Sequence, residues 1–173
     1  LLSLADLVKN TLDTDNQIQS ACNSFVDAKG SMFLGRGSSF PIALEGALKL
    51  KELAYIHAEG YPAGEMKHGP LALIEDGMPV VVIAPRDYYY NKTISNMQEV
   101  IARGAKVLLI TNKSTDEIFS ENIWQKIEVE NTDDDLLPFL ITIPLQKLAY
   151  HSALKKGYDI DKPRNLAKSV TVE

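Results

Sequence analysis

The chain has 173 residues, of which 45% are hydrophobic and 24% are charged, and its formal net charge is −5. This composition and length are typical of one globular domain with a single core. The acidic balance and the lack of a Lys/Arg cluster argue against nucleic acid and against an anionic membrane surface as partners. The most apolar segment, Leu136–Leu154, is interrupted by Pro138, Lys147 and His151. It predicts a buried helical segment and no membrane span.

The cysteine content and the start of the chain bear on where the protein acts. Cys22 is the only cysteine, which excludes an internal disulfide and favours a reducing, cytoplasmic location. No basic and then apolar leader opens the chain. Leu1 stands where an initiator Met is expected, so we expect a piece of a longer protein. No group of His, Asp and Glu has the spacing of metal ligands, and we expect neither a metal nor a dissociable cofactor.

The first half of the chain alternates between helical and strand patterns. Leu4–Ala28 has apolar residues at helical spacing. Met32–Leu34 predicts a short buried strand that leads into a glycine turn at Gly35–Gly37. Ile42–Ala58, rich in Ala, Leu, Lys and Glu, predicts a long helix. The polar, glycine-containing segment Glu59–Gly69 predicts a loop.

The second half continues the alternation. Strands are predicted at Pro79–Ala84, Val107–Thr111 and near Ile127–Val129, and helices at Asp87–Arg103 and Leu137–Lys156, the last with an irregularity near Pro144. Strands separated by helices favour an α/β fold with a parallel sheet covered on both faces. We expect one domain over residues 1–160 and a C-terminal tail over residues 161–173.

Three charged residues of the second predicted helix share one face. Glu45, Lys49 and Glu52 stand at i, i+4 and i+7. One interpretation is an exposed face with helix-stabilising charge pairs. The other is a carboxylate kept ionised by a neighbouring ammonium and ready to act as a base. The pattern leaves both open.

The C-terminal tail carries a lysine among apolar residues. Lys168 follows Leu166 and Ala167 and precedes Val170. If these neighbours desolvate the amine, its pKa falls and it becomes a nucleophile for carbonyl groups. The alternative is a solvated lysine on a loose end of the chain.

Two further features have both a structural and a functional interpretation. His68 lies on a glycine-flanked loop and has a side chain suited to proton exchange near neutral pH, but such a histidine also suits a solvated surface. His57 is its competitor, although a structural place at the helix end is favoured for it. The turn Gly35–Ser39 either cradles a phosphate at a helix N-terminus or uses its glycines for geometry alone.

Most of the chain, in the same order, resembles the glucosamine-6-phosphate synthase family, the isomerising glutamine:fructose-6-phosphate aminotransferases. The similar segments are Phe33–Gly37, Ala43–Glu52, Tyr55–Glu59, Gly64–Leu73, Ile143–His151 and Pro163–Glu173. The resemblance implies a sugar-isomerase (SIS) domain, a flavodoxin-like fold with three αβα layers. In that family two such domains follow a glutaminase domain, and this chain resembles the second.

The resemblance also implies roles for individual residues. Glu52 would transfer the proton between C1 and C2 of the sugar, with Lys49 supporting the substrate site. Lys168 would form a Schiff base with open-chain fructose 6-phosphate. His68 would act in the site of a neighbouring subunit and help to open the sugar ring, which implies a homodimer.

Three other tail residues take roles from the same resemblance. Ala167 would line the sugar site, and Val170 would lie toward the ammonia channel. Arg164 would contact the glutaminase domain.

The implied whole enzyme makes glucosamine 6-phosphate and glutamate from fructose 6-phosphate and glutamine. The isolated chain should fold but turn over little substrate, because the family's sugar-phosphate loop lies in the first SIS domain. An alternative is a non-catalytic module of the same fold that senses sugar phosphates, and another is a purely structural, dimerising half. A base together with an imine-forming amine disfavours a sensor, which needs neither.

Overall fold

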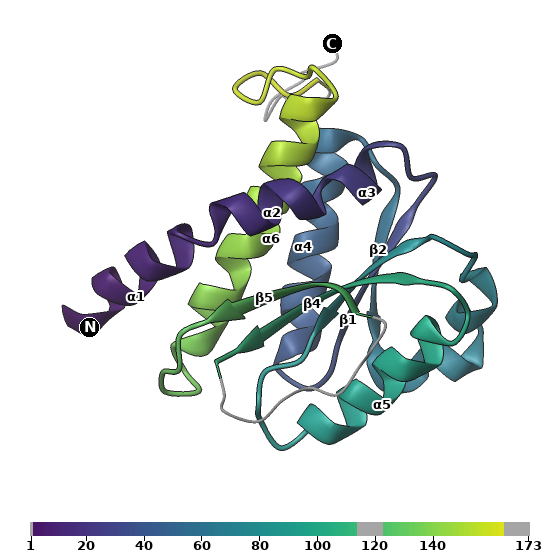
Figure 1. Ribbon diagram of the computed structural model, residues 1–173, viewed down its shortest axis with the longest axis horizontal. Coiled ribbons are helices and arrows are strands. Elements are labelled where there is room, and N and C mark those ends of the chain that lie inside the picture. Colours follow the sequence, from purple (N-terminus) through teal and green to yellow (C-terminus); the bar gives the residue numbers. More distant parts are fainter. Residues whose placement is uncertain (1, 114–122, 165–173) are drawn as a thin grey trace, which may run out of the picture.

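The computed structural model describes residues 2–113 and 123–164, and in this part five parallel strands form one sheet. The sheet order is β2-β1-β3-β4-β5 (Figure 1). The strands are β1 (Ser31–Gly35), β2 (Ala58–Pro62), β3 (Pro79–Ile83), β4 (Lys106–Asn112) and β5 (Ile123–Val129). This is the doubly wound order of flavodoxin-like folds, so the predicted α/β class is confirmed.

Helices cover both faces of this sheet and give three layers. The helices α4 (Ser39–Ala54) and α6 (Leu137–Lys155) pack together on one face. On the other face lie α5 (Tyr90–Ile101) and the short 3₁₀ helix η1 (Ala63–His68), which is followed by η2 (Pro70–Leu73) (Figure 1). Successive side chains of a strand point to opposite faces, so β1 contributes to two cores. Phe33 packs in the α4/α6 core, and Met32 and Leu34 pack in the α5/η1 core.

The N-terminal segment is three helices where the sequence predicts one, so that prediction is wrong. The helices are α1 (Leu2–Leu12), α2 (Asp15–Ala21) and α3 (Asn23–Val26). At the first break, the Thr14 hydroxyl donates a hydrogen bond to the Thr11 carbonyl over 2.7 Å. Such local side-chain bonds compete with the helical backbone ladder.

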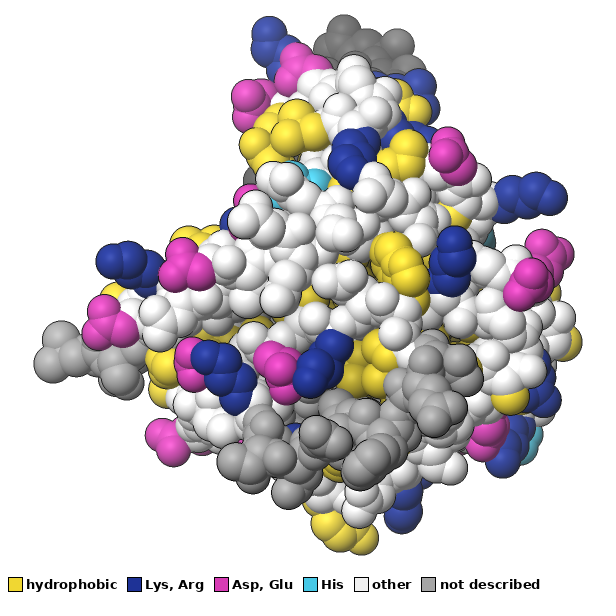
Figure 2. Space-filling view, in the orientation of Figure 1, with side chains coloured by type: hydrophobic (Ala, Val, Ile, Leu, Met, Phe, Trp, Pro, Cys, Tyr) yellow, Lys and Arg dark blue, Asp and Glu magenta, His cyan; other side chains and the backbone are white. Residues whose placement is uncertain are grey.

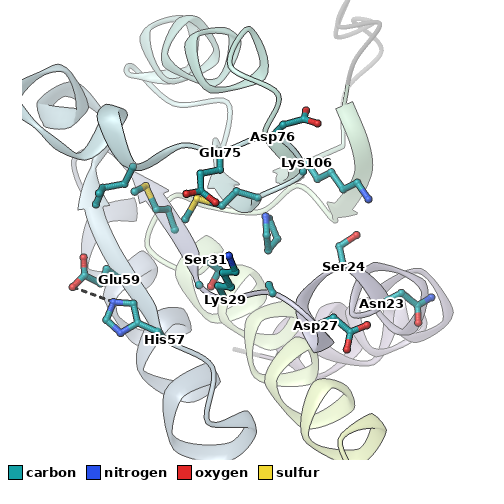
Figure 3. Close-up of a pocket in the computed structure, with 17 residues that line it drawn as sticks. Asn23, Ser24, Asp27, Lys29, Ser31, His57, Glu59, Glu75, Asp76 and Lys106 are labelled. Atoms are coloured by element: carbon teal, nitrogen blue, oxygen red, sulfur yellow. Dashed lines mark ion pairs between the residues drawn. The ribbon is translucent and has the colours of Figure 1, made fainter.

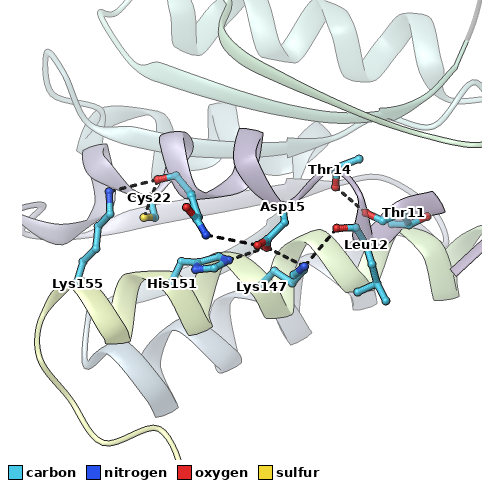
Figure 4. A network of polar contacts seen from close by, with 9 residues as sticks. Thr11, Leu12, Thr14, Asp15, Cys22, Lys147, His151 and Lys155 are labelled. Atoms are coloured by element: carbon cyan, nitrogen blue, oxygen red, sulfur yellow. Dashed lines mark hydrogen bonds and ion pairs between the residues drawn. The ribbon is translucent and has the colours of Figure 1, made fainter. Parts of the chain in front are cut away.

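The helices α1 and α2 pack along α6, and a polar network fastens them there (Figure 4). Asp15 Oδ1 lies 2.7 Å from Lys147 Nζ and 2.6 Å from His151 Nε2. Lys147 lowers the pKa of Asp15 most, and His151 lowers it further. His151 is 7% exposed, so this ion pair lies at the buried side of α6.

The predicted loop at Glu59–Gly69 is also wrong, because it contains β2 and η1. Among the described strands, β2 pairs with β1 alone and is a sheet edge. A Cβ atom at Gly60 would come within 2.9 Å of the Leu44 backbone nitrogen, so glycine lets the edge strand pack against α4. The residues of β2 have weak strand propensity, so the stability of this strand comes from its pairing with β1.

The two long helices differ in how well their ends are predicted. The helix expected over Ile42–Ala58 ends at Ala54, because Tyr55 adopts a left-handed conformation with φ 55°. The helix α6 runs continuously through Pro144.

No described helix is long and apolar enough to cross a membrane. On the face shown in Figure 2, basic and acidic side chains are interspersed.

Candidate active site

The last turns of α4 carry the predicted proton-transfer residue. Lys49 Nζ lies 2.6 Å from Glu52 Oε2 and 3.8 Å from Glu45 Oε1. These are the i,i+3 and i,i+4 neighbours of one helix face, so the predicted shared face is confirmed. The side chains of Lys49 and Glu52 are 29% and 26% exposed. The pair is thus partly withdrawn from water but still reachable from outside.

The electrostatics of this pair favour a charged lysine. The hydrogen bond to Glu52 raises the pKa of Lys49, against the opposing effect of partial burial. Lys49 therefore remains an ammonium at neutral pH and holds the Glu52 carboxylate by a charge-assisted hydrogen bond. A carboxylate has more acceptor positions than this one bond uses, so Glu52 can still accept a proton from a ligand.

The course of α4 places Glu52 at the amino edge of the sheet. The helix begins after β1, at the carboxyl edge, and returns to the start of β2. Thirteen residues separate Ser39 from Glu52, which at 1.5 Å per residue is about 20 Å. A hexose phosphate extends over about 10 Å by bond-length arithmetic. A phosphate held in the turn before α4 therefore cannot belong to a sugar that reacts at Glu52.

The glycines of that turn have a structural explanation. A Cβ atom at Gly35 would lie 2.2 Å from the Ser39 carbonyl oxygen. Gly37 has φ +57°, and a Cβ atom there would lie 2.6 Å from the Tyr89 ring. Both positions need glycine for close packing and backbone geometry. The structure thus supports the geometric interpretation of Gly35–Ser39.

His68 lies on the opposite side of the sheet from Glu52. It ends η1, whose Ala63 and Met66 belong to the α5 core, whereas α4 covers the other face. The His68 ring is 75% exposed, and its Nε2 lies 3.9 Å from Glu65 Oε2. A single chain does not bring His68 and Glu52 together. His57 is likewise exposed, in the segment before β2, with its Nε2 3.6 Å from Glu59 Oε1.

Of the predicted tail residues, the structure describes Arg164. Its backbone N–H donates to the Tyr55 hydroxyl over 2.7 Å, and its guanidinium lies 4.1 Å from the Tyr55 ring centroid. Arg164 therefore lies at the end of α4. Ala167, Lys168 and Val170 lie outside the described residues.

A cavity of about 660 Å³ opens at the amino edge of the sheet, and sequence reasoning missed it. Figure 3 shows His57 and Glu59 on one side of it and Asn23, Ser24 and Asp27 on the other. The Tyr61 hydroxyl donates to Glu59, and this contact raises the pKa of Tyr61. The lining comes from segments far apart in the chain, so no local pattern could reveal it. The two predicted catalytic residues that the structure describes, Glu52 and His68, do not line the cavity.

Comparison with protein families decides what kind of domain this is. The SIS domain model matches residues 24–156. The chain belongs to the SIS domain family. The match covers the whole sheet, together with α4, α5 and α6, and leaves α1 and α2 outside.

Individual relatives refine this placement of the SIS domain. Over 173 residues the chain is 51% identical to a glutamine–fructose-6-phosphate aminotransferase (isomerizing) of Bartonella henselae, covering 100% of this chain and 28% of the relative. A solved C-terminal domain of glucosamine-fructose-6-phosphate aminotransferase from Francisella tularensis matches with a TM-score of 0.88 and 46% identity, over 92% of this chain and 45% of that one. A glucosamine-6-phosphate deaminase from Thermotoga maritima matches with a TM-score of 0.72 and 28% identity, over 95% of this chain and 48% of that one.

These figures set the scope of the SIS domain within a larger protein. The chain spans less than a third of the Bartonella relative and less than half of either solved chain. The resemblance on which the sequence analysis rests is confirmed at the level of the family and of the C-terminal domain.

Proposed function

We propose that this SIS domain is the C-terminal isomerase domain of a glucosamine-6-phosphate synthase, which makes glucosamine 6-phosphate and glutamate from fructose 6-phosphate and glutamine. The observation that carries the proposal is the Lys49–Glu52 pair, 2.6 Å apart on the last turns of α4. It supplies a partly exposed carboxylate, oriented by an ammonium, of the kind that proton transfer requires. The similarity to isomerising aminotransferases over the whole chain supports the substrate.

The proposed chemistry begins at Lys168. Its amine attacks the C2 carbonyl of open-chain fructose 6-phosphate, and water leaves as the imine forms. Ammonia from glutamine then displaces the lysine, so that nitrogen stays on C2. Glu52 removes a proton from C1, because the C2 imine accepts the electron pair, and it returns a proton to C2. The C1 hydroxyl loses its proton as C1 becomes an aldehyde. C1 is oxidised and C2 reduced, so no external oxidant is needed.

The other residues complete the proposed site. Lys49 holds the Glu52 carboxylate in place by a hydrogen bond, and Ala167 lines the sugar site. Arg164 and Val170 face the glutaminase domain and the ammonia channel. The structure supports a contribution of His68 from a neighbouring subunit, because within one chain this exposed ring lies across the sheet from α4. The active enzyme is thus a homodimer.

The proposal assigns the sugar phosphate to another part of the enzyme. Within residues 2–113 and 123–164, the turn Gly35–Ser39 is the one phosphate-like turn; it lies about 20 Å from Glu52 along α4, and packing explains its glycines. The first SIS domain would therefore hold the phosphate, and the isolated chain should fold but turn over little substrate. The single Cys22 fits a reducing compartment, so the proposal places the enzyme in the cytoplasm.

The decisive experiment traps the imine in the full-length protein. Fructose 6-phosphate is added, borohydride reduces any imine, and peptide mass spectrometry locates the adduct. We expect the adduct on Lys168, its loss in Lys168→Arg, and its retention in the matched control Lys162→Arg. If fructose 6-phosphate binds and no adduct forms on Lys168, a sugar-phosphate sensor replaces the synthase as the favoured function.

A further inference from the structure

Two long helices end side by side, and each places a tyrosine at its end. Tyr55 caps α4, and Tyr158 follows α6. Their ring centroids are 4.8 Å apart at an interplanar angle of 60°. This separation is that of a favourable aromatic pair. The two rings therefore form one aromatic surface next to the C-terminal tail.

The backbone fixes Tyr55 in an unusual way. Tyr55 is the only non-glycine residue with a positive φ in the described parts of the chain. Helices that end with a left-handed residue normally use glycine or asparagine there, because a side chain adds strain. The backbone of Tyr55 is therefore strained, and its ring contacts Tyr158 and Arg164. Strain of this kind points to a function when the surroundings hold it.

Tyr158 is fixed by a different device. Gly157 has φ +72°, its N–H bonds the Leu154 carbonyl, and the Tyr158 N–H bonds the Ala153 carbonyl over 3.0 Å. These two bonds form a Schellman motif, which ends α6 and turns the chain sharply. Tyr158 also packs against the α4/α6 core. Its ring position therefore depends on the end of a buried helix.

Arg164 lies over both rings. Its guanidinium carbon is 4.1 Å from the Tyr55 centroid and 5.6 Å from the Tyr158 centroid, and its backbone N–H bonds the Tyr55 hydroxyl. A planar guanidinium suits stacking on an aromatic face, and a cation gains from the ring electrons. Three contacts thus hold one residue of the tail.

The site that receives Arg164 adjoins the proposed catalytic carboxylate. Tyr55 is three residues after Glu52, which is about one helical turn. Lys168 is four residues after Arg164, so their Cα atoms are at most about 14 Å apart. Fixing Arg164 on Tyr55 therefore places the start of the segment that carries Lys168 at the end of α4.

We propose that Tyr55 and Tyr158 form an aromatic seat for Arg164, and that this seat positions the tail so that Lys168 forms its imine with a sugar that lies beside Glu52. The inference rests on the proposed function, since Lys168 must form the imine. The tyrosines touch neither substrate nor reacting atoms and are positioning residues. Positioning of this kind mainly affects kcat, because it orders the reacting groups without binding the sugar.

The test uses the full-length enzyme and the formation of glucosamine 6-phosphate from fructose 6-phosphate and glutamine, the reaction that passes through the Lys168 imine. Tyr158→Leu should lower kcat about 10-fold and change KM less than about 2-fold. Tyr158→Phe keeps the ring and should restore kcat to within about 2-fold of the unmodified enzyme. Tyr88→Leu is the matched control, because Tyr88 is 84% exposed and lies between β3 and α5.

A second measurement is independent of catalysis. Limited trypsin digestion, followed by mass spectrometry, measures cleavage after Arg164. Tyr158→Leu should increase this rate at least about 5-fold, because loss of the seat releases the arginine. Cleavage after Arg103, at the exposed end of α5, should not change.

The outcomes separate this inference from the proposed function. A Tyr158→Leu enzyme with unchanged kcat overturns the positioning role, whatever its rate of trypsin cleavage. Unchanged cleavage after Arg164 would show that the Tyr158 ring does not hold Arg164, and this result also overturns the positioning role. If borohydride traps no adduct on Lys168 in the unmodified enzyme, the proposed function fails, while the digestion still tests the seat itself.

Discussion

The carboxyl edge and the amino edge of the sheet differ in the roles of their residues. The carboxyl edge has a glycine turn and the start of a long helix, the features that usually bind a ligand in doubly wound folds. In this chain packing accounts for both glycines. The amino edge holds the Lys49–Glu52 pair, the aromatic seat and a cavity of about 660 Å³. The general rule that doubly wound folds bind ligands at the carboxyl edge of the sheet therefore does not locate the site proposed here. The chemistry of particular residues at the amino edge does.

Removing the carboxylate at the amino edge should have the largest effect. In the full-length enzyme, Glu52→Gln should lower kcat for sugar isomerisation about 10³-fold, because the amide cannot take up a proton. Circular dichroism and the melting temperature should stay close to those of the unmodified enzyme. The matched control is Glu130→Gln, beyond β5 at the carboxyl edge, where the carboxylate contacts Lys113. Full activity in Glu52→Gln would remove the amino edge as the site of chemistry.

At the carboxyl edge, the corresponding change should act on stability. Gly35→Ala places a Cβ atom 2.2 Å from the Ser39 carbonyl oxygen, so the start of α4 must shift. We expect a loss of about 1–3 kcal/mol in the free energy of unfolding, measured by urea denaturation of the isolated chain. Gly157→Ala is not a suitable control, because φ is +72° there. Lys29→Ala, an exposed change in the turn before β1, should leave stability nearly unchanged.

Removing the ammonium beside Glu52 should have a smaller effect than removing Glu52. Lys49→Met keeps most of the side-chain volume and should lower kcat about 10-fold, because the carboxylate loses its oriented partner. Glu52 raises the pKa of Lys49, so the pair stabilises the fold fully below the ordinary lysine pKa of about 10.4. That contribution is lost as pH rises through the raised pKa.

Thermal unfolding from pH 7 to pH 11 checks this dependence. The difference in melting temperature between the unmodified chain and Lys49→Met should be constant near neutral pH and should shrink above about pH 10.4. A difference that instead shrinks between pH 7 and pH 9 would contradict the assignment to Lys49.

The smallest expected effect lies away from both edges, where α2 meets α6. The pKa of Asp15 is lowered, so its pairs with Lys147 and His151 stabilise the fold above the unfolded pKa of about 3.9. This stabilisation is lost as pH falls through the lowered pKa. Asp15→Asn should cost about 1 kcal/mol at pH 7, because the Asp15 side chain is 33% exposed and water screens the pairs. Urea denaturation at pH 7 and pH 3 measures it, and the difference from the unmodified chain should be smaller at pH 3.

Periodicity predicted the regular parts of this fold well. The buried strands β1, β3 and β4 and the helices α4, α5 and α6 stand where apolar spacing places them, within a few residues at the ends. The edge strand β2 was missed, because its residues have little strand propensity and its stability comes from pairing with β1. The break between α1 and α2 was missed because side-chain bonds at Thr14 compete with the helix.

The sequence by itself determined the fold class and the Glu45, Lys49 and Glu52 face, because helix and strand periods are local properties of the chain. Through the resemblance of its segments it also determined the family. The tertiary structure alone decided that His68 and Glu52 lie across the sheet from each other, and that Arg164 returns to the rings of Tyr55 and Tyr158. Such contacts join residues far apart in the chain, and their geometry depends on where helices end and how they pack.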